Sequence, residues 1–282
     1  MRGVKGKYMR RSVLWAVLLP LCLSHAFFGG RGSMLSAEIP YREVDVKDGG
    51  TIRGTVRLVG HVTRVDALTV TKDESICGKR KPSPRLVVGK NNGLGNAIVY
   101  LEGITQGKKF GRNLRVILDQ RKCEYLPHIL LLPLQGQLEI VNDDRILHNV
   151  HAYDLDAEMK TLFNIAQPIK GQRTPIKQTP KKKAGLVLTT CDAGHPWMSA
   201  HIMCTEHPYY AVTDANGSFI LNDVPSGAYT LKMWHEGVAV TKTEMENGKV
   251  KKYYFEEPYE NAQQITVSSS GVTTTDFEFS LR

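Results

Sequence analysis

The stretch CDAGHPWM at residues 191–198 places Cys191, His195 and Met198 within eight positions. A thiolate, an imidazole and a thioether are ligand types that bind copper in trigonal sites built from two His, one Cys and a weak axial Met. Each of these residues alone is more often an ordinary core residue, so only their coincidence indicates a metal site. One imidazole is missing, and it must come from elsewhere in the chain.

His148 is the best candidate for the missing imidazole. It lies forty-three residues before Cys191 and follows QLEIV at 137–141, an alternating run that predicts a strand. Residues 184–190, AGLVLTT, predict a second strand that ends at Cys191. Two neighbouring strands ending on the same side of a sandwich would bring His148 to the 191–198 loop. His151 is a competing ligand, but on a strand its side chain would point to the opposite face.

Both segments resemble those of cupredoxins, in an Asn-x5-His-Asn segment at 142–149 and a Cys-x3-His-x2-Met loop at 191–198. The ligands that this resemblance implies for one type 1 copper ion are His148, Cys191, His195 and Met198. It also implies that Asn142 braces the ligand loop and hydrogen-bonds near the thiolate. The chain departs from the family in spacing: cupredoxins commonly have two or four residues between Cys and His, and this chain has three, including Gly194.

The sequence changes character after residue 206. TDANGSF at 213–219 predicts a hairpin across an Asn-Gly turn, and VPSGAYTL at 224–231 leads from a turn into an alternating strand. The pattern resembles the carboxypeptidase regulatory-like, transthyretin-like module, which implies a small non-catalytic sandwich. The two halves together are similar to exported bacterial proteins, some of them grouped with methylamine-utilisation proteins. We therefore expect an all-β chain, with a cupredoxin-like Greek-key β-sandwich over 45–205 and a transthyretin-like β-sandwich over 206–282.

The N-terminus is typical of a secretory signal peptide. Basic residues precede an apolar run at 13–23, which is too short to span a bilayer, since about 20 residues are needed. Cleavage is expected after Ala26 or Ala37, and residues 1–37 are assigned to the signal and a short leader. The alternative is an uncleaved anchor. We expect a periplasmic, secreted or cell-envelope protein with no stable membrane span after cleavage.

The charge of the chain does not indicate nucleic-acid binding. The formal net charge is +9, and removal of the five basic residues before Ala26 leaves about +4. One basic cluster precedes Cys191, and it consists of Lys170, Arg173, Lys177, Lys181, Lys182 and Lys183. This cluster is either a solvated face or a dock for an acidic redox partner such as a c-type cytochrome.

The cysteines are consistent with export to an oxidising compartment. Cys77 and Cys123 are the natural disulfide pair there, which leaves Cys204 as a buried free thiol. The alternative pairing of Cys191 with Cys204 would abolish the copper site, and the sequence leaves it open.

Enzyme motifs are absent from the sequence. It contains no His-x-His or His-Cys-His cluster of a multicopper oxidase, no Gly-x-Ser-x-Gly, no phosphate-binding Gly loop and no His-Glu-x-x-His. A single blue-copper centre moves one electron, so the leading hypothesis is a non-enzymatic electron carrier. Copper handling or sensing, and a metal-free envelope scaffold or binding module, are the alternatives.

Overall fold

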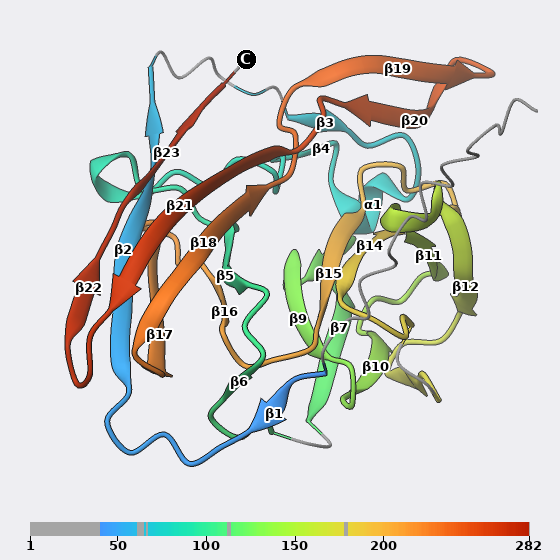
Figure 1. The fold of residues 1–282 in the computed structure, drawn as a ribbon. Coiled ribbons are helices and arrows are strands. Elements are labelled where there is room, and N and C mark those ends of the chain that lie inside the picture. The colour runs from blue at the N-terminus through green and yellow to red at the C-terminus, as the bar shows by residue number, and fades with distance from the viewer. Residues whose placement is uncertain (1–39, 61–64, 66, 112–113, 178–179, 282) are drawn as a thin grey trace, which may run out of the picture. The chain divides into compact units, whose positions relative to one another are not determined.

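The computed structural model describes residues 40–60, 65, 67–111, 114–177 and 180–281. The expected signal peptide at 1–37 lies outside the described residues. Nearly all regular structure in the described part is β-strand (Figure 1), with a single short α-helix, α1 (Glu74–Cys77). This confirms the all-β class. Among the described residues, no helix has the length and apolar character needed to cross a membrane.

Two sheets enclose the first hydrophobic core and form what we call sandwich A. Its first sheet has the strand order β13 (Gln172–Pro175), β10 (Gln137–Asn142), β7 (Arg115–Arg121) and β8 (Glu124–Leu126). Its second sheet has the order β12 (Lys160–Gln167), β11 (His148–Asp154), β14 (Gly185–Thr190), β15 (Ser199–Thr205) and β9 (Ile129–Pro133). Leu118 and Ile140 from one sheet and Val187 from the other are fully buried in this core.

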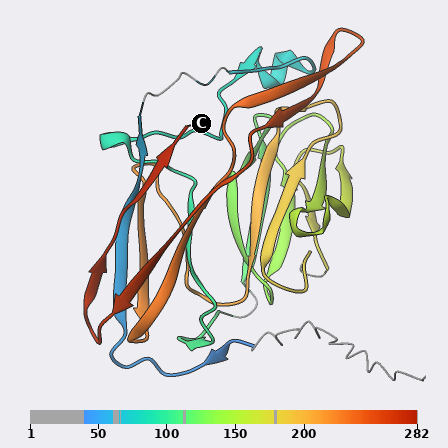
Figure 2. The same ribbon diagram turned by 45° about the horizontal axis from the view of Figure 1, so that its top comes forward.

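Two further sheets enclose a second core and form sandwich B (Figure 2). The first has the order β16 (Tyr210–Val212), β5 (Ile98–Glu102), β18 (Gly227–His235) and β21 (Tyr259–Val267). The second consists of β17 (Ser218–Val224), β2 (Gly50–Val59), β22 (Val272–Thr274) and β23 (Phe277–Ser280). Sandwich B therefore takes β2 and β5 from before residue 206 and joins them to strands that follow it.

The chain passes between the sandwiches more than once, so the expected division at residue 206 marks only one of these crossings. β15 ends sandwich A at Thr205, and β16 begins in sandwich B at Tyr210. β2 pairs with β17, β22 and β23, while β5 lies between β16 and β18. Without β2, the sheet that contains β17 would lose the strand that joins its members, because β17, β22 and β23 all pair with it.

The Asn-Gly turn is present, but the hairpin predicted across it is wrong. Gly217 has a φ of 77° and donates its N–H to Asp214 O, which is the backbone conformation that glycine favours in such turns. β16 then pairs with β5 and β17 pairs with β2, so the turn connects two different sheets. A close backbone contact supports this arch, because Val56 donates its N–H to Gly217 O at 2.8 Å.

A small apolar cluster joins the sandwiches. Ile129 and Met203 come from sandwich A, and Ile98 and Trp234 come from sandwich B. The shorter elements lie outside the four sheets: β1 (Arg42–Glu43) pairs with β6 (Gln106–Gly107), β3 (Leu68–Thr69) with β4 (Arg80–Lys81), and β19 (Val240–Glu246) with β20 (Lys249–Phe255). Two 3-10 turns, η1 (Lys90–Asn92) and η2 (Leu155–Ala157), complete the described elements.

Candidate metal centre

Antiparallel pairing of β11 with β14 brings the expected ligands together. His148 is the first residue of β11, and Cys191 directly follows the last residue of β14. Because His151 pairs with Thr190, the start of β11 lies beside the end of β14. His195 and Met198 lie in the loop that leads from β14 to β15. The sequence predicted that His148 follows the strand at 137–141, which is β10. His148 is instead the first residue of β11, which lies in the same sheet as β14 and pairs with it.

Three donor atoms form a compact triangle at this point. His148 Nδ1 lies 3.3 Å from His195 Nδ1 and 4.0 Å from Cys191 Sγ, and His195 Nδ1 lies 3.4 Å from Cys191 Sγ. A point about 2.1 Å from all three atoms lies inside the triangle, close to the roughly 2.0–2.3 Å bonds that Zn²⁺ forms with imidazole and thiolate. The triangle has the size of a coordination site for a first-row transition-metal ion. The donor set of two imidazoles and one thiolate is the one that type 1 copper uses.

Carboxylates fix the outer nitrogen of each histidine. His148 Nε2 lies 2.9 Å from Asp144 Oδ2, and His195 Nε2 lies 2.9 Å from Asp73 Oδ2. Donation of Nε2–H to these oxygens leaves Nδ1 of each ring directed at the centre of the triangle. Such outer contacts set the tautomer and ring orientation of metal-binding histidines.

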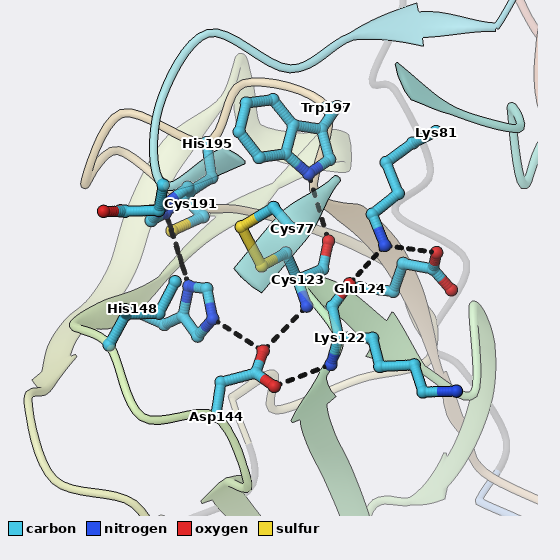
Figure 3. The surroundings of a disulfide bond; sticks show 12 residues. Cys77, Lys81, Lys122, Cys123, Glu124, Asp144, His148, Cys191, His195 and Trp197 are labelled. Carbon is cyan, nitrogen blue, oxygen red and sulfur yellow. Dashed lines mark hydrogen bonds and ion pairs between the residues drawn. A yellow bond between two sulfur atoms is a disulfide. The ribbon is translucent and has the colours of Figure 1, made fainter. Parts of the chain in front are cut away.

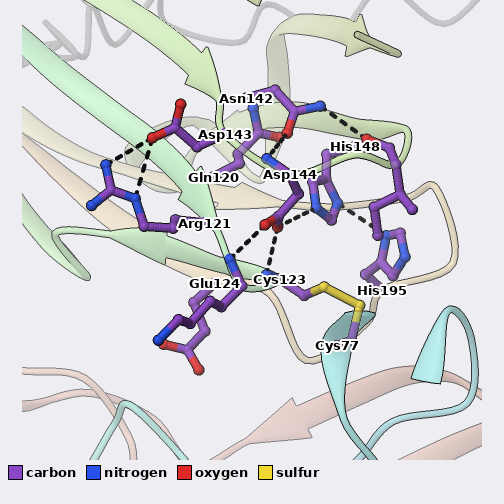
Figure 4. A network of polar contacts seen from close by, with 12 residues as sticks. Cys77, Gln120, Arg121, Cys123, Glu124, Asn142, Asp143, Asp144, His148 and His195 are labelled. Atoms are coloured by element: carbon purple, nitrogen blue, oxygen red, sulfur yellow. Dashed lines mark hydrogen bonds and ion pairs between the residues drawn. A yellow bond between two sulfur atoms is a disulfide. The ribbon is translucent and has the colours of Figure 1, made fainter. Parts of the chain in front are cut away.

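Asp144 is itself held rigidly (Figure 4). Its Oδ1 accepts the backbone N–H of Lys122 and its Oδ2 that of Cys123, both at 2.7 Å. Burial alone would raise the pKa of Asp144, but the hydrogen bonds from His148 and from the Cys123 and Lys122 backbones outweigh burial and lower it. The carboxylate therefore stays ionised beside His148.

Hydrogen bonds favour the thiolate form of Cys191 despite its burial. Burial would raise the pKa of this thiol, but hydrogen bonds from His148, His195 and the Asn149 backbone N–H lower it to about 6. Burial likewise opposes protonation of His148, whereas its hydrogen bonds to Asp144 and Cys191 raise its pKa to about 9. Binding of a metal cation to these donors would release the proton that His148 and Cys191 share.

Asn142 braces the ligand segment, while Asn149 contacts the sulfur. The Asn142 amide donates to Ile146 O at 2.9 Å and to Gln167 O at 2.7 Å, and its Oδ1 accepts the Asp144 N–H at 3.0 Å. The hydrogen bond to the Cys191 sulfur comes from the backbone N–H of Asn149. The sulfur contact expected of Asn142 is therefore made by the residue that directly follows His148.

Asn149 also ties the two ligand segments together. Its side-chain Oδ1 accepts the Ala193 N–H at 2.8 Å, and the Tyr125 hydroxyl donates to its carbonyl oxygen. Burial, followed by the negative charge of Cys191, raises the Tyr125 pKa well above its usual value. The second Asn of the Asn-x5-His-Asn segment is a readable signal for this role, although the resemblance assigned the sulfur contact to the first.

Met198 lies in the same buried layer as Cys191. It belongs to the sandwich A core with Cys191 and Trp197, and its backbone N–H donates to His195 O at 2.9 Å. This hydrogen bond closes a turn over residues 195–198. The imidazoles of His148 and His195 are both 0% exposed, so the triangle is closed to solvent.

Residues 72–77, which we call the cover segment, close the site from outside. Asp73 contacts His195, and Lys72 Nζ donates to Ala193 O at 2.6 Å. Gly194 makes room for this contact: its φ is 93°, and a Cβ atom there would lie 2.8 Å from Lys72 Cδ. The disulfide between Cys77 and Cys123 anchors the segment next to the ligands (Figure 3), which confirms that pairing. Cys191 and Cys204 are both free and buried.

Other residues considered from the sequence lie outside the triangle. His151 contacts Asp192 through Nδ1 and Thr161 through Nε2, so it faces away from the ligands as expected. Lys181 is a buried member of the basic cluster and forms ion pairs with Asp154 and Asp156. The sequence carried no signal for Asp73, which lies 122 residues from His195.

Several solved structures are similar to part of the chain. A purple cupredoxin from Nitrosopumilus maritimus is 21% identical over 33% of this chain and 100% of its own, with a TM-score of 0.27. Amicyanin from Paracoccus versutus is 21% identical over 32% of this chain and 81% of its own, with a TM-score of 0.27. A Cu-containing nitrite reductase from Thermus scotoductus SA-01 is 21% identical over 36% of this chain and 24% of its own, with a TM-score of 0.26.

No protein-family model matches the chain, and no curated protein sequence matches it. The structural similarity extends over about a third of the chain. The assignment of the site therefore rests on its own side chains.

Proposed function

We propose that the chain is an exported type 1 copper protein that carries one electron. The observation that carries this proposal is the buried triangle of His148 Nδ1, His195 Nδ1 and Cys191 Sγ, whose three sides measure 3.3, 3.4 and 4.0 Å. Met198 would contribute its thioether sulfur to the same ion in this proposal. A copper ion bound here would supply one-electron Cu(II)/Cu(I) chemistry at a trigonal site that suits both oxidation states.

The protein's own residues have three tasks in this function. Asp144 and Asp73 hold the imidazoles so that Nδ1 of each ring points at the ion. The Asn149 N–H donates a hydrogen bond to the sulfur, and hydrogen bonds to a thiolate tune the reduction potential of its metal. The cover segment keeps water out, which limits solvent reorganisation when the charge on the site changes.

The enclosure of the site favours a resident ion over a cargo ion. His195 has no exposed surface, and the cover segment over it is anchored by the Cys77–Cys123 disulfide. A protein that delivers copper to a partner needs ligands within the partner's reach. The alternative of copper handling or sensing is therefore the less supported one, and a metal-free scaffold does not explain why three donors converge.

The remaining parts of the proposal follow from the sequence. Sandwich A is the cupredoxin-like Greek-key unit, and sandwich B carries the carboxypeptidase regulatory-like, transthyretin-like pattern as a non-catalytic accessory. The N-terminal signal peptide directs the protein to the periplasm or cell envelope, where an acidic redox partner such as a c-type cytochrome exchanges electrons with it. The protein is not an enzyme and binds no nucleic acid.

Optical spectroscopy of copper-loaded full-length protein tests the proposal. The wild type should show an intense visible thiolate-to-Cu(II) band, and the Cys191→Ser variant should not. Voltammetry should give a reversible one-electron wave, and reduced protein should transfer an electron to a c-type cytochrome. Tight Cu(I) binding without the visible band or electron exchange would identify copper handling instead, and failure to retain copper would leave the scaffold.

A further inference from the structure

A second group of metal-binding side chains lies where the two sandwiches meet. His128, His201 and Glu236 each offer one donor atom, and these three atoms lie within 4.8 Å of one another. We call these three residues the junction cluster. Their exposed fractions are 6%, 4% and 1%, so the cluster is sealed from solvent. None of the three belongs to the Cys191 site.

The fold brings the junction cluster together from separate strands. His128 precedes β9, and His201 lies in β15, which pairs with β9 in parallel. Glu236 follows β18 of sandwich B. The apolar side chains around the junction include Trp234, whose ring centroid lies 5.2 Å from that of His201. Buried polar groups in such surroundings require partners, because an unpaired one loses its hydrogen bonds to water without replacement.

Backbone and side-chain contacts orient the donors toward one point. His128 Nδ1 bonds to Ser199 O at 2.9 Å, which turns its Nε2 toward Glu236 Oε1. A histidine that donates its other N–H to a backbone carbonyl is the usual arrangement at metal sites. His201 Nδ1 lies 3.4 Å from Glu236 Oε2 and makes no hydrogen bond within the described residues. This buried nitrogen could therefore bind a metal ion, since it faces a carboxylate and has no hydrogen-bond partner among the described residues.

Arg85 holds the carboxylate but leaves one of its oxygens for a ligand. Arg85 Nη1 lies 2.7 Å from Glu236 Oε2, so Oε1 remains on the side of His128. Arg85 also donates to Gly237 O at 2.9 Å, and its guanidinium carbon lies 3.6 Å from the centroid of the Phe255 ring. These contacts hold the guanidinium independently of His128 and His201, so Arg85 can stay in place when a cation binds.

We propose that His128 Nε2, His201 Nδ1 and Glu236 Oε1 bind a divalent transition-metal ion of the class that takes imidazole and carboxylate ligands, for which Zn²⁺ is the probe. Binding replaces the hydrogen shared by His128 Nε2 and Glu236 Oε1, and that proton leaves to solvent. The ion then joins β9 and β15 of sandwich A to β18 of sandwich B. His128 bonds to Ser199 O, and Ser199 directly follows Met198. The junction cluster and the 191–198 loop are therefore linked through the start of β15.

Zinc retention by the full-length protein tests this site. The protein is first loaded with one equivalent of copper, then exposed to Zn²⁺, desalted, and analysed for both metals. We expect one zinc ion per chain in addition to the copper, and a zinc absorption-edge spectrum with nitrogen and oxygen neighbours only. Wild-type protein that retains no zinc, or a spectrum with sulfur neighbours, would overturn the proposal and leave a metal-free ion-pair network between the sandwiches.

Variants separate the two sites. His201→Gln should weaken zinc binding more than about 100-fold, since loss of a ligand exceeds the 10–100-fold effect of losing an outer contact. The matched control His207→Gln alters a buried histidine outside the cluster and should retain zinc. Cys191→Ser should lose the copper site and keep the zinc, so failure of either function is visible separately. If His201→Gln loses its folded near-ultraviolet spectrum, the ligand spectrum of the wild type decides the question.

Discussion

The two free cysteines of sandwich A lie at opposite ends of one pair of strands and have opposite chemistry. Cys191 follows β14 and Cys204 lies near the end of β15, and both are buried. Hydrogen bonds from two histidines and the Asn149 N–H overcome the effect of burial at Cys191 and lower its pKa to about 6. At Cys204 burial dominates and raises the pKa to about 12, although Lys181 opposes it.

Burial alone therefore does not decide the role of a cysteine in this fold. What separates the two residues is the number of donors aimed at the sulfur. The Cys191 end of the strand pair is surrounded by imidazoles that carboxylates hold in place. The Cys204 end has the backbone N–H and charge of Lys181, whose ammonium is already paired with Asp154 and Asp156. Only the first sulfur is prepared to bind a metal.

The largest effect on copper binding is expected when Cys191 is replaced by serine, and the same replacement at Cys204 is the comparison. Cys191→Ser should abolish the visible copper band, whereas Cys204→Ser should leave the band and the copper stoichiometry unchanged. Copper titration followed by absorption spectroscopy measures both. Mass spectrometry of the unreduced wild type should find Cys77 linked to Cys123, and Cys191 and Cys204 as free thiols. A Cys191–Cys204 linkage in that sample would contradict the comparison.

Asp144 is expected to have the next largest effect. Asp144→Asn removes the negative charge that orients His148 and should weaken copper binding by about 10–100-fold, as outer contacts of metal-binding histidines do. Competition with a chromogenic copper chelator measures this change. Asp143→Asn is the matched control, because Asp143 is the preceding residue and pairs with Arg121 away from the site. Equal affinities of the two variants would show that Asp144 does not position the ligand.

The sequence predicted the local parts of this arrangement better than the distant ones. Alternating runs located β2, β10 and β14, and the coincidence of Cys, His and Met identified the 191–198 loop. These are signals between neighbours in the chain. Asp73 reaches His195 through a fold in which the cover segment crosses the ligand loop, and no pattern within either segment records that contact.

For the same reason, the sequence did not predict that β2 belongs to sandwich B. β2 has an alternating pattern that suits a half-buried strand in either sandwich, and its partners β17, β22 and β23 lie more than 150 residues later in the chain. The Asn-Gly turn at 216–217 specified a reversal of the chain but not the sheet that each arm enters. Asn149 was readable, because it is the residue that follows a predicted ligand.

Gly194 should show a smaller effect on the Cys191 side of the comparison. Gly194→Ala places a Cβ atom in a left-handed backbone conformation and against Lys72, and we expect a loss of about 1–2 kcal/mol in the free energy of unfolding. Gly171→Ala is the matched control, because Gly171 also has a positive φ but has open space around its Cβ position. Chemical denaturation of both variants measures the difference. An equal or larger loss at Gly171 would mean that the Lys72 contact does not constrain the loop.

The smallest effect is expected at Cys204. Ionisation of its thiol should make the free energy of unfolding fall as the pH rises. Its pKa is about 12 in the folded protein, against 9.0 for an ordinary cysteine thiol, so the folded state keeps the thiol protonated while the unfolded chain ionises. This contribution to stability is fully present below pH 9 and is lost as the pH rises toward 12. Between pH 9 and 10 the loss amounts to about 1 kcal/mol. Cys204→Ala should remove that part of the slope in denaturation curves measured at both pH values, because the variant has no thiol to ionise in either state. An unchanged slope would mean that Cys204 ionises as readily in the fold as in the unfolded chain, and the contrast with Cys191 would then rest on the copper ligands alone.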